Sequence, residues 1–100
     1  MSEAKQNRVI LARYKVPAAN LEKVKALLQE MQFLSLQEEG CLVYQPHQTV
    51  EDPCTIVLYE VYKDDAAINA HRDSDHFQTI ALGQIVPLLE SRAVEILSQF

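Results

Sequence analysis

Hydrophobic and polar residues follow two different periods along this chain, and the two periods predict strands and helices in turn. Apolar and β-branched runs of strand type predict strands over residues 8–16, 41–50, 55–62 and 92–97. Apolar residues at helical spacing predict a long helix over 20–38 and short helices over 66–72 and 76–82. Gly83 and Pro87 predict that the stretch to Ser91 is irregular at its end. The order β-α-β-β-α-β predicts an α+β, ferredoxin-like fold, an antiparallel sheet with helices on one face.

Residues at the ends of these elements sharpen the prediction. Asn20 is a suitable N-cap for the long helix, and Gly40 is expected to end it in the left-handed conformation. Pro46 lacks an N–H group and therefore predicts an edge position or a bulge. Residues 55–62, apolar on both faces apart from Glu60, are expected to form a central strand. An Asp in the segment 63–65 is placed to cap the next helix.

Strands that are apolar on both faces also predict a partner. Val, Ile and Leu occur at odd and even positions of the first and third strands, so the sheet face without helices is expected to be apolar as well. Large exposed apolar patches usually mark interfaces. We therefore expect a homodimer formed sheet against sheet.

Composition and charge limit the class of protein. One hundred residues with 48% hydrophobic content predict a single domain over residues 1–100, with its core at about 8–98. A net charge of −5 with scattered Lys and Arg argues against nucleic acid and membrane surfaces as partners. The first eight residues are polar and no apolar run approaches membrane-spanning length, so a cytoplasmic protein is expected.

The two cysteines are expected to be free thiols. Cys41 and Cys54 each lie near the start of a predicted strand, and in an antiparallel hairpin these starts lie at opposite ends. The separation of roughly 30 Å is too long for a disulfide.

Most familiar catalytic signatures are absent from the sequence. With Gly40 and Gly83 as its only glycines, the chain has no phosphate-binding glycine loop, and no cofactor is expected. His71 and His76 would lie about 140° apart on one continuous helix, so no metal site is expected. His71 is either a satisfied, half-buried polar residue or an acid/base or substrate-binding group.

Glu60 is the unusual residue of the third strand. A carboxylate in an apolar strand requires a partner, such as an ion pair with Arg13 or Arg92, or it faces a pocket where burial would raise its pKa. Tyr14, Tyr44, Tyr59 and Tyr62 belong to the core or to the wall of such a pocket, where a hydroxyl could bind a phenolic ligand. These alternatives are left open by the residues alone.

An ordered set of short motifs resembles the antibiotic biosynthesis monooxygenase (ABM) superfamily over about residues 8–98. The motifs are the segment 39–44 (EGCLVY), Asp52-Pro53, the segment 59–62 (YEVY), Ala70-His71, and Ser74 with His76 and Phe77. The resemblance implies a ferredoxin-like fold that assembles as a dimeric α/β barrel. Members of the superfamily oxygenate quinols or anthrones without metal or flavin, degrade haem, or process a phosphorylated autoinducer.

The chain differs from the haem-degrading branch of the superfamily, and it resembles the autoinducer branch only in part. Haem-degrading members carry an Asn on the first strand and a Trp after the third strand's Glu, whereas this chain has no Trp and Tyr62 takes that place. The segments 36–40 (LQEEG) and 59–64 (YEVYKD) are similar to the autoinducer branch. That branch has a His late in the first helix, where this chain has Gln32.

The resemblance and the residues together predict a cofactor-independent monooxygenase that uses dioxygen on a small aromatic or quinol-like molecule. The predicted catalytic residues are His71 and Glu60. The predicted substrate-binding residues are Tyr62, Tyr44, Tyr14, His76 and Phe77. One alternative is an isomerase of a small phosphorylated sugar, with Arg72 or Lys63 binding the phosphate. Another is a non-catalytic dimeric binding or stress-associated module.

Overall fold

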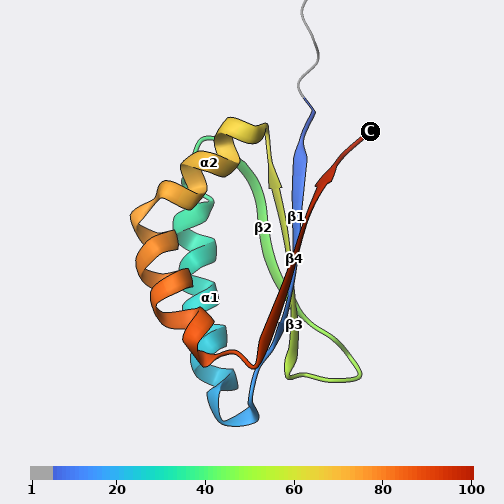
Figure 1. Ribbon diagram of the computed structural model, residues 1–100, viewed down its shortest axis with the longest axis vertical. Helices are drawn as coiled ribbons and strands as arrows, with labels where there is room; N and C mark the ends of the chain where they lie inside the picture. The colour runs from blue at the N-terminus through green and yellow to red at the C-terminus, as the bar shows by residue number, and fades with distance from the viewer. Residues whose placement is uncertain (1–5) are drawn as a thin grey trace, which may run out of the picture.

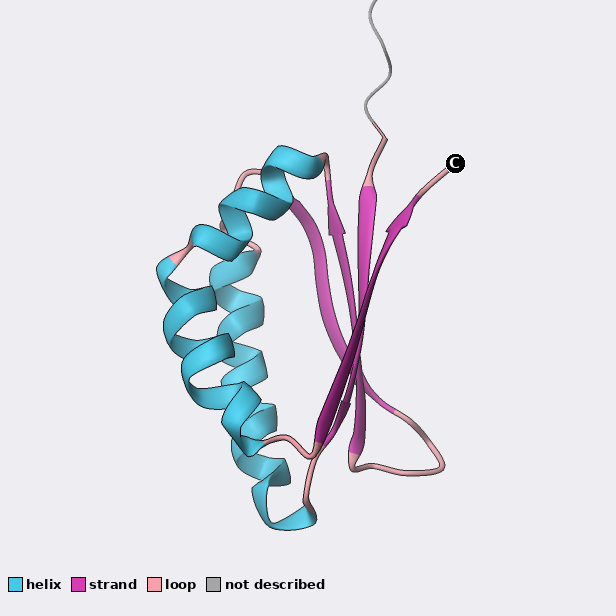
Figure 2. Cartoon of the chain, in the orientation of Figure 1, coloured by secondary structure: helices cyan, strands magenta, loops and turns pink. Residues whose placement is uncertain are grey.

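A computed structural model, which describes residues 6–100, shows one antiparallel sheet of four strands with all its helices on one face (Figures 1 and 2). The predicted α+β ferredoxin-like fold is confirmed. Residues 1–5 of the polar N-terminal segment lie outside the described residues. No described helix is long and apolar enough to cross a membrane. The elements are β1 (Arg8–Lys15), η1 (Ala18–Asn20), α1 (Leu21–Ser35), β2 (Cys41–Gln48), β3 (Thr55–Tyr62), α2 (Asp65–Asp73), η2 (Phe77–Ile85), η3 (Val86–Leu88) and β4 (Ser91–Ser98).

The strand order β2-β3-β1-β4 places β3 and β1 inside the sheet and β2 and β4 at its edges. The predicted central position of β3 is therefore confirmed, as is the edge position that Pro46 indicated on β2. The irregularity of β2 lies between Cys41 and Val43 and not at Pro46. Cys41 and Cys54 are both free, as expected.

Helix α1 ends three residues earlier than its periodicity predicts, because turns occupy residues 36–38. Its apolar stripe buries Val24, Leu28 and Met31 in the core. Asn20 does not cap the helix through its side chain; its amide instead donates to the carbonyl of Leu88, which ties the start of α1 to the chain before β4.

Gly40 has a different role from the predicted one. No described glycine has a positive φ, so the left-handed conformation is not the reason for glycine here. A Cβ at position 40 would lie 2.4 Å from the Cβ of Ala67, well inside the contact distance of two carbons. Gly40 therefore allows the start of β2 to pass close to α2.

The second helical region is broken at Ser74, where the backbone is extended. The carboxylate of Asp64 caps α2 by accepting from the N–H of Ala67 at 2.8 Å, as predicted, and the Ser74 hydroxyl accepts from the N–H of Phe77. The chain then continues as the wide π-helical segment η2 and the short helix η3. Residues 83–88 are thus helical, and the irregular end expected before Ser91 is limited to residues 89 and 90.

Candidate active site

Glu60 lies on the helix-facing side of β3 with 5% of its surface exposed. Tyr62, two residues on and therefore on the same face of the strand, donates its hydroxyl hydrogen to Glu60 Oε1 over 2.7 Å. Burial raises the pKa of Glu60 to about 7, although the bond from Tyr62 opposes this shift. The predicted ion pair with Arg13 or Arg92 is wrong. Arg13 lies on the other face of β1, and Glu60 accepts a hydrogen bond from Tyr62 instead.

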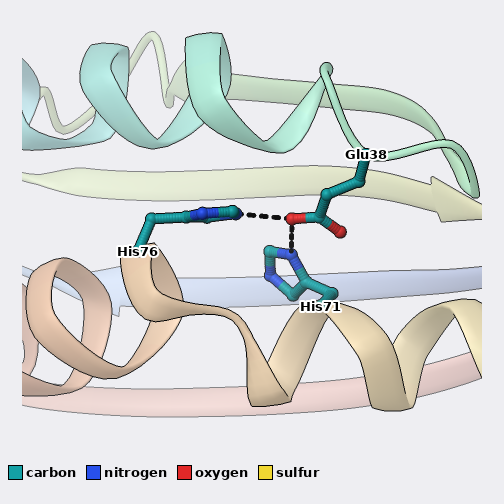
Figure 3. A group of neighbouring side chains, drawn as sticks. All are labelled: Glu38, His71 and His76. Atoms are coloured by element: carbon teal, nitrogen blue, oxygen red, sulfur yellow. Dashed lines mark hydrogen bonds and ion pairs between the residues drawn. The ribbon is translucent and has the colours of Figure 1, made fainter.

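His71, on α2, connects two carboxylates. It is 2% exposed, its Nδ1 lies 2.9 Å from Glu38 Oε2, and its Nε2 lies 3.9 Å from Glu60 Oε1 (Figure 3 shows the bond to Glu38). Because a carboxylate only accepts, the proton of the neutral ring resides on Nδ1 and the lone pair of Nε2 is on the side of Glu60. Burial lowers the pKa of His71, which favours this neutral form.

Glu38 also accepts from a second imidazole. His76 Nε2 lies 2.5 Å from the same Oε2 atom, so both rings converge on one carboxylate oxygen (Figure 3). The expectation that His71 and His76 diverge assumed a continuous helix, and the break at Ser74 removes that condition. Two imidazoles and a carboxylate, with donor atoms within 4.8 Å of one another, are also a set that could hold a divalent cation.

Aromatic rings enclose His71. The ring centroids of Tyr62 and Phe77 lie 5.1 and 5.2 Å from that of His71, and the centroid of Tyr44 lies 6.1 Å away. Burial raises the pKa of both tyrosines well above the usual range, so they are neutral phenols that can donate hydrogen bonds. The aromatic enclosure therefore excludes water from the imidazole without adding charge.

A cavity of about 260 Å³ opens in front of Glu60, between the β1–β4 side of the sheet and the second helical region. Its lining residues are Ile10, Ala12, Tyr14, Glu60, Arg72, Phe77, Leu82, Arg92 and Val94. Of the seven predicted site residues, Glu60, Tyr14 and Phe77 line this cavity. The other four do not line it. Tyr62 and His71 lie beside Glu60, and Tyr44 and His76 lie beside His71.

Sequence reasoning missed Glu38 as a site residue. It was read as the end of the first helix, whereas its carboxylate binds both histidines. The topology contains a signal for it. In a β-α-β-β-α-β fold, the end of the first helix, the end of the third strand and the start of the second helix lie at one end of the sheet. A carboxylate in the segment 36–40 could thus have been placed near Glu60 and His71.

Comparison with known proteins shows which family the chain resembles. The sequence profile described as antibiotic biosynthesis monooxygenase matches residues 8–81. A conserved protein from Methanosarcina mazei is similar in structure, with TM-score 0.90 and 23% identity over 97% of this chain and 96% of that one. A Mycobacterium tuberculosis protein has TM-score 0.87 and 26% identity over 94% and 95%.

A protein from Nitrosomonas europaea, whose name refers to antibiotic biosynthesis monooxygenase, has TM-score 0.89 and 23% identity over 100% and 96%. No curated protein is significantly similar to the chain. The profile match covers well over half of the sequence, and the structural likeness extends over almost all of it. The chain therefore belongs to the antibiotic biosynthesis monooxygenase family.

Proposed function

We propose that the protein is a cofactor-independent monooxygenase that oxidises a small aromatic or quinol-like substrate in the cavity in front of Glu60. The observation that carries this proposal is a buried carboxyl with a pKa of about 7 on the wall of a largely apolar cavity. A general base works best when its pKa is near the working pH. An engineered cavity of about 150 Å³ accepts benzene, so about 260 Å³ suits one or two fused rings.

Glu60 is the base that removes a proton from a substrate hydroxyl. Tyr62 holds the carboxylate through its hydrogen bond, and Arg72, which lines the same cavity, offers a positive charge to the substrate anion. His71 is the second proton acceptor: its Nε2 faces Glu60, and Glu38 fixes the proton on Nδ1. Glu38 acts only through His71, so its proposed role is that of a positioning residue.

The substrate supplies all the electrons for the reaction. A quinol gives one proton to Glu60, and the quinolate transfers one electron to dioxygen, giving a semiquinone and superoxide. These two radicals combine through a new C–O bond, and Glu60 returns its proton to the distal oxygen of the peroxide. The O–O bond then breaks as water leaves with the hydrogen of the same carbon. Quinol plus dioxygen thus gives hydroxyquinone plus water.

Oxygen uptake with a panel of benzene-, naphthalene- and anthracene-type quinols tests the proposal. We expect uptake above the uncatalysed rate for at least one quinol, and transfer of a single labelled atom from ¹⁸O₂ into the product. Uptake equal to the blank for the wild-type protein and for His71→Ala alike would refute it.

The phosphorylated-sugar alternative is less consistent with the geometry. Arg72 lines the cavity, but Lys63 lines a separate hollow beside Glu38 and Gly40, where it pairs with Glu39 at 3.6 Å. Of the two candidate phosphate contacts, only Arg72 therefore lines the cavity in front of Glu60. A non-catalytic module would be favoured by a pocket filled with the protein's own side chains, whereas a cavity is present in front of Glu60. Oxygen uptake distinguishes such a module from the proposed enzyme.

The homodimer also remains a proposal. The helices cover one face of the sheet only (Figure 2), and the other face carries apolar side chains at alternating positions. They are Val9, Leu11, Val57, Tyr59, Val61 and Leu97. We propose a second copy of the chain against this face. Light scattering at micromolar concentration should give twice the chain mass, and Tyr59→Lys should reduce it; a wild-type monomer would refute the dimer.

A further inference from the structure

The cavity has polar groups at both ends. Glu60 lies opposite Ile10 in the register of the sheet, whereas Arg92 lies opposite Tyr14, four residues further along β1. Four residues of strand span about 13 Å. At one end the positive charge of Arg72 interacts electrostatically with Glu60. At the other end the positive charge of Arg92 interacts with Tyr14. The proposed chemistry uses only the Glu60 end.

The side chains between these two ends are apolar. Ala12 and Val94 face each other across β1 and β4, and Leu82 of η2 lies on the opposite wall. Val94 and Leu82 remain 44% and 38% exposed, so this stretch is open to a ligand. An apolar body with a polar group at each end would therefore match the lining of the cavity.

Arg92 is free to bind an anion. Among residues 6–100, no carboxylate forms an ion pair with it, whereas Arg8 is bound by Asp65 at 2.9 Å. Its side chain alternates onto the helix-facing side of the edge strand β4, next to the buried Tyr14, whose hydroxyl is a second possible donor. A guanidinium presents paired N–H donors that match the two oxygens of a carboxylate.

We infer that the substrate carries a carboxylate at the end remote from its reacting hydroxyl, and that Arg92 binds this carboxylate. The inference rests on the proposed function for the identity of the reacting hydroxyl at Glu60. It makes Arg92 a specificity-determining residue and the ligand class a hydroxylated aromatic acid. The length of the cavity requires the two groups on opposite sides of the ring system and not on neighbouring carbons.

Two ligands that cannot react as quinols test this inference by binding alone. 6-Hydroxy-2-naphthoate carries its hydroxyl and carboxylate at opposite ends, and 2-naphthol lacks the carboxylate. Titration followed by naphthol fluorescence should show that the wild-type protein binds the naphthoate at least about tenfold more tightly, the scale of one charge-assisted contact. 1-Hydroxy-2-naphthoate, with adjacent groups, should bind no more tightly than 2-naphthol.

The variant Arg92→Gln should abolish the preference by weakening the naphthoate alone. The matched control is Lys23→Gln, which removes an exposed positive charge from α1, away from the cavity, and should change neither affinity. Equal wild-type affinities for the two ligands would overturn the inference. So would a loss of 2-naphthol binding in Arg92→Gln as large as the loss of naphthoate binding.

These measurements involve no oxygen, so the two proposals can fail separately. Carboxylate preference without oxygen uptake on any quinol, carboxylated quinols included, would refute oxygenation and leave the ligand class standing. Oxygen uptake without carboxylate preference would refute the role of Arg92 and leave the monooxygenase standing.

Discussion

Two regions under the same face of the sheet are built from opposite kinds of residue. Beneath α1, Val24, Leu28 and Met31 belong to one buried apolar core with Ile56 and Leu58. Beneath α2, two residues further along β3, polar side chains that carry protons fill the corresponding space. Burying a carboxyl costs stability unless its partners compensate. The α1 region therefore stabilises the fold, and the α2 region is available for chemistry.

The substitution Glu60→Gln should separate the two regions most clearly. The amide still accepts from Tyr62 but cannot remove a proton, so the oxidation rate should fall about 10²- to 10⁴-fold. Thermal stability should not fall, because a buried acid is replaced by a neutral group of similar shape. Oxygen uptake and thermal melting of the same samples check both parts. Glu95→Gln, an exposed carboxylate of β4, is the control, and equal loss in both variants would contradict the assignment.

Leu28→Ala should produce the opposite pattern. This side chain is fully buried beneath α1, and its truncation should lower the free energy of unfolding by about 2–5 kcal/mol, measured by urea denaturation. The rate of the folded fraction should change little. Leu36→Ala, at a half-exposed leucine, should be nearly neutral. A large drop in rate for the folded Leu28→Ala protein would show that the two regions are not independent.

The fold was predictable from the sequence because it depends on periodicity, and periodicity is local. The apolar stripe of 20–38 and the two-sided apolar run of 55–62 each specify an element without knowledge of its neighbours. Element ends were less accurate where tertiary contacts decide them. Asn20 binds Leu88 instead of capping α1, and Gly40 is needed for its approach to Ala67.

The candidate site was only partly predictable for the same reason. Glu60 was recognisable as a carboxyl in an apolar strand, which is a local anomaly. The role of Glu38 was not recognisable, because its contacts with His71 and His76 span 33 and 38 residues of sequence. The separate helices predicted over 66–72 and 76–82 agree with the break at Ser74. The local sequence did not show that this break turns His76 back toward His71.

The pH dependence of stability should differ between the wild type and Glu60→Gln. The folded pKa of Glu60, about 7, lies above its usual value of 4.5, so the folded state binds more protons between these values. Its contribution is full below pH 4.5 and is lost as the pH rises toward 7, a change on the order of 3 kcal/mol. The lowered pKa of His71 acts in the opposite direction below its usual value of 6.5.

The difference between the two proteins isolates Glu60, because Glu38, His71 and Arg72 surround it in both. Urea denaturation at a series of pH values measures that difference. The oxidation rate should rise with pH through about 7 as the base form increases. A pH-independent difference in stability would contradict a raised pKa.

Gly40→Ala tests the contact that brings the two regions together. The added Cβ would lie 2.4 Å from Ala67 Cβ, so overpacking should lower stability by about 1–3 kcal/mol. The double variant Gly40→Ala/Ala67→Gly removes the clash and should recover much of the loss, which a double-mutant cycle by thermal or urea denaturation measures. Gly83→Ala, with its nearest contact at 3.3 Å, should have a smaller effect. Full additivity would show that the two positions do not touch.

Chelation should have the smallest effect of all. Glu38, His71 and His76 resemble a cation site by composition, but both imidazole N–H groups already donate to one carboxylate oxygen. A bound cation would displace both of these hydrogen bonds and occupy the oxygen that fixes the proton of His71 on Nδ1. Dialysis against EDTA should therefore leave oxygen uptake and melting temperature unchanged, and added zinc should inhibit. The opposite result would be activity that is lost on chelation and restored by zinc in the wild type, but does not respond to zinc in His76→Gln. That result would assign the cluster to a metal. It would also remove the distinction between a proton-carrying α2 region and an apolar α1 region.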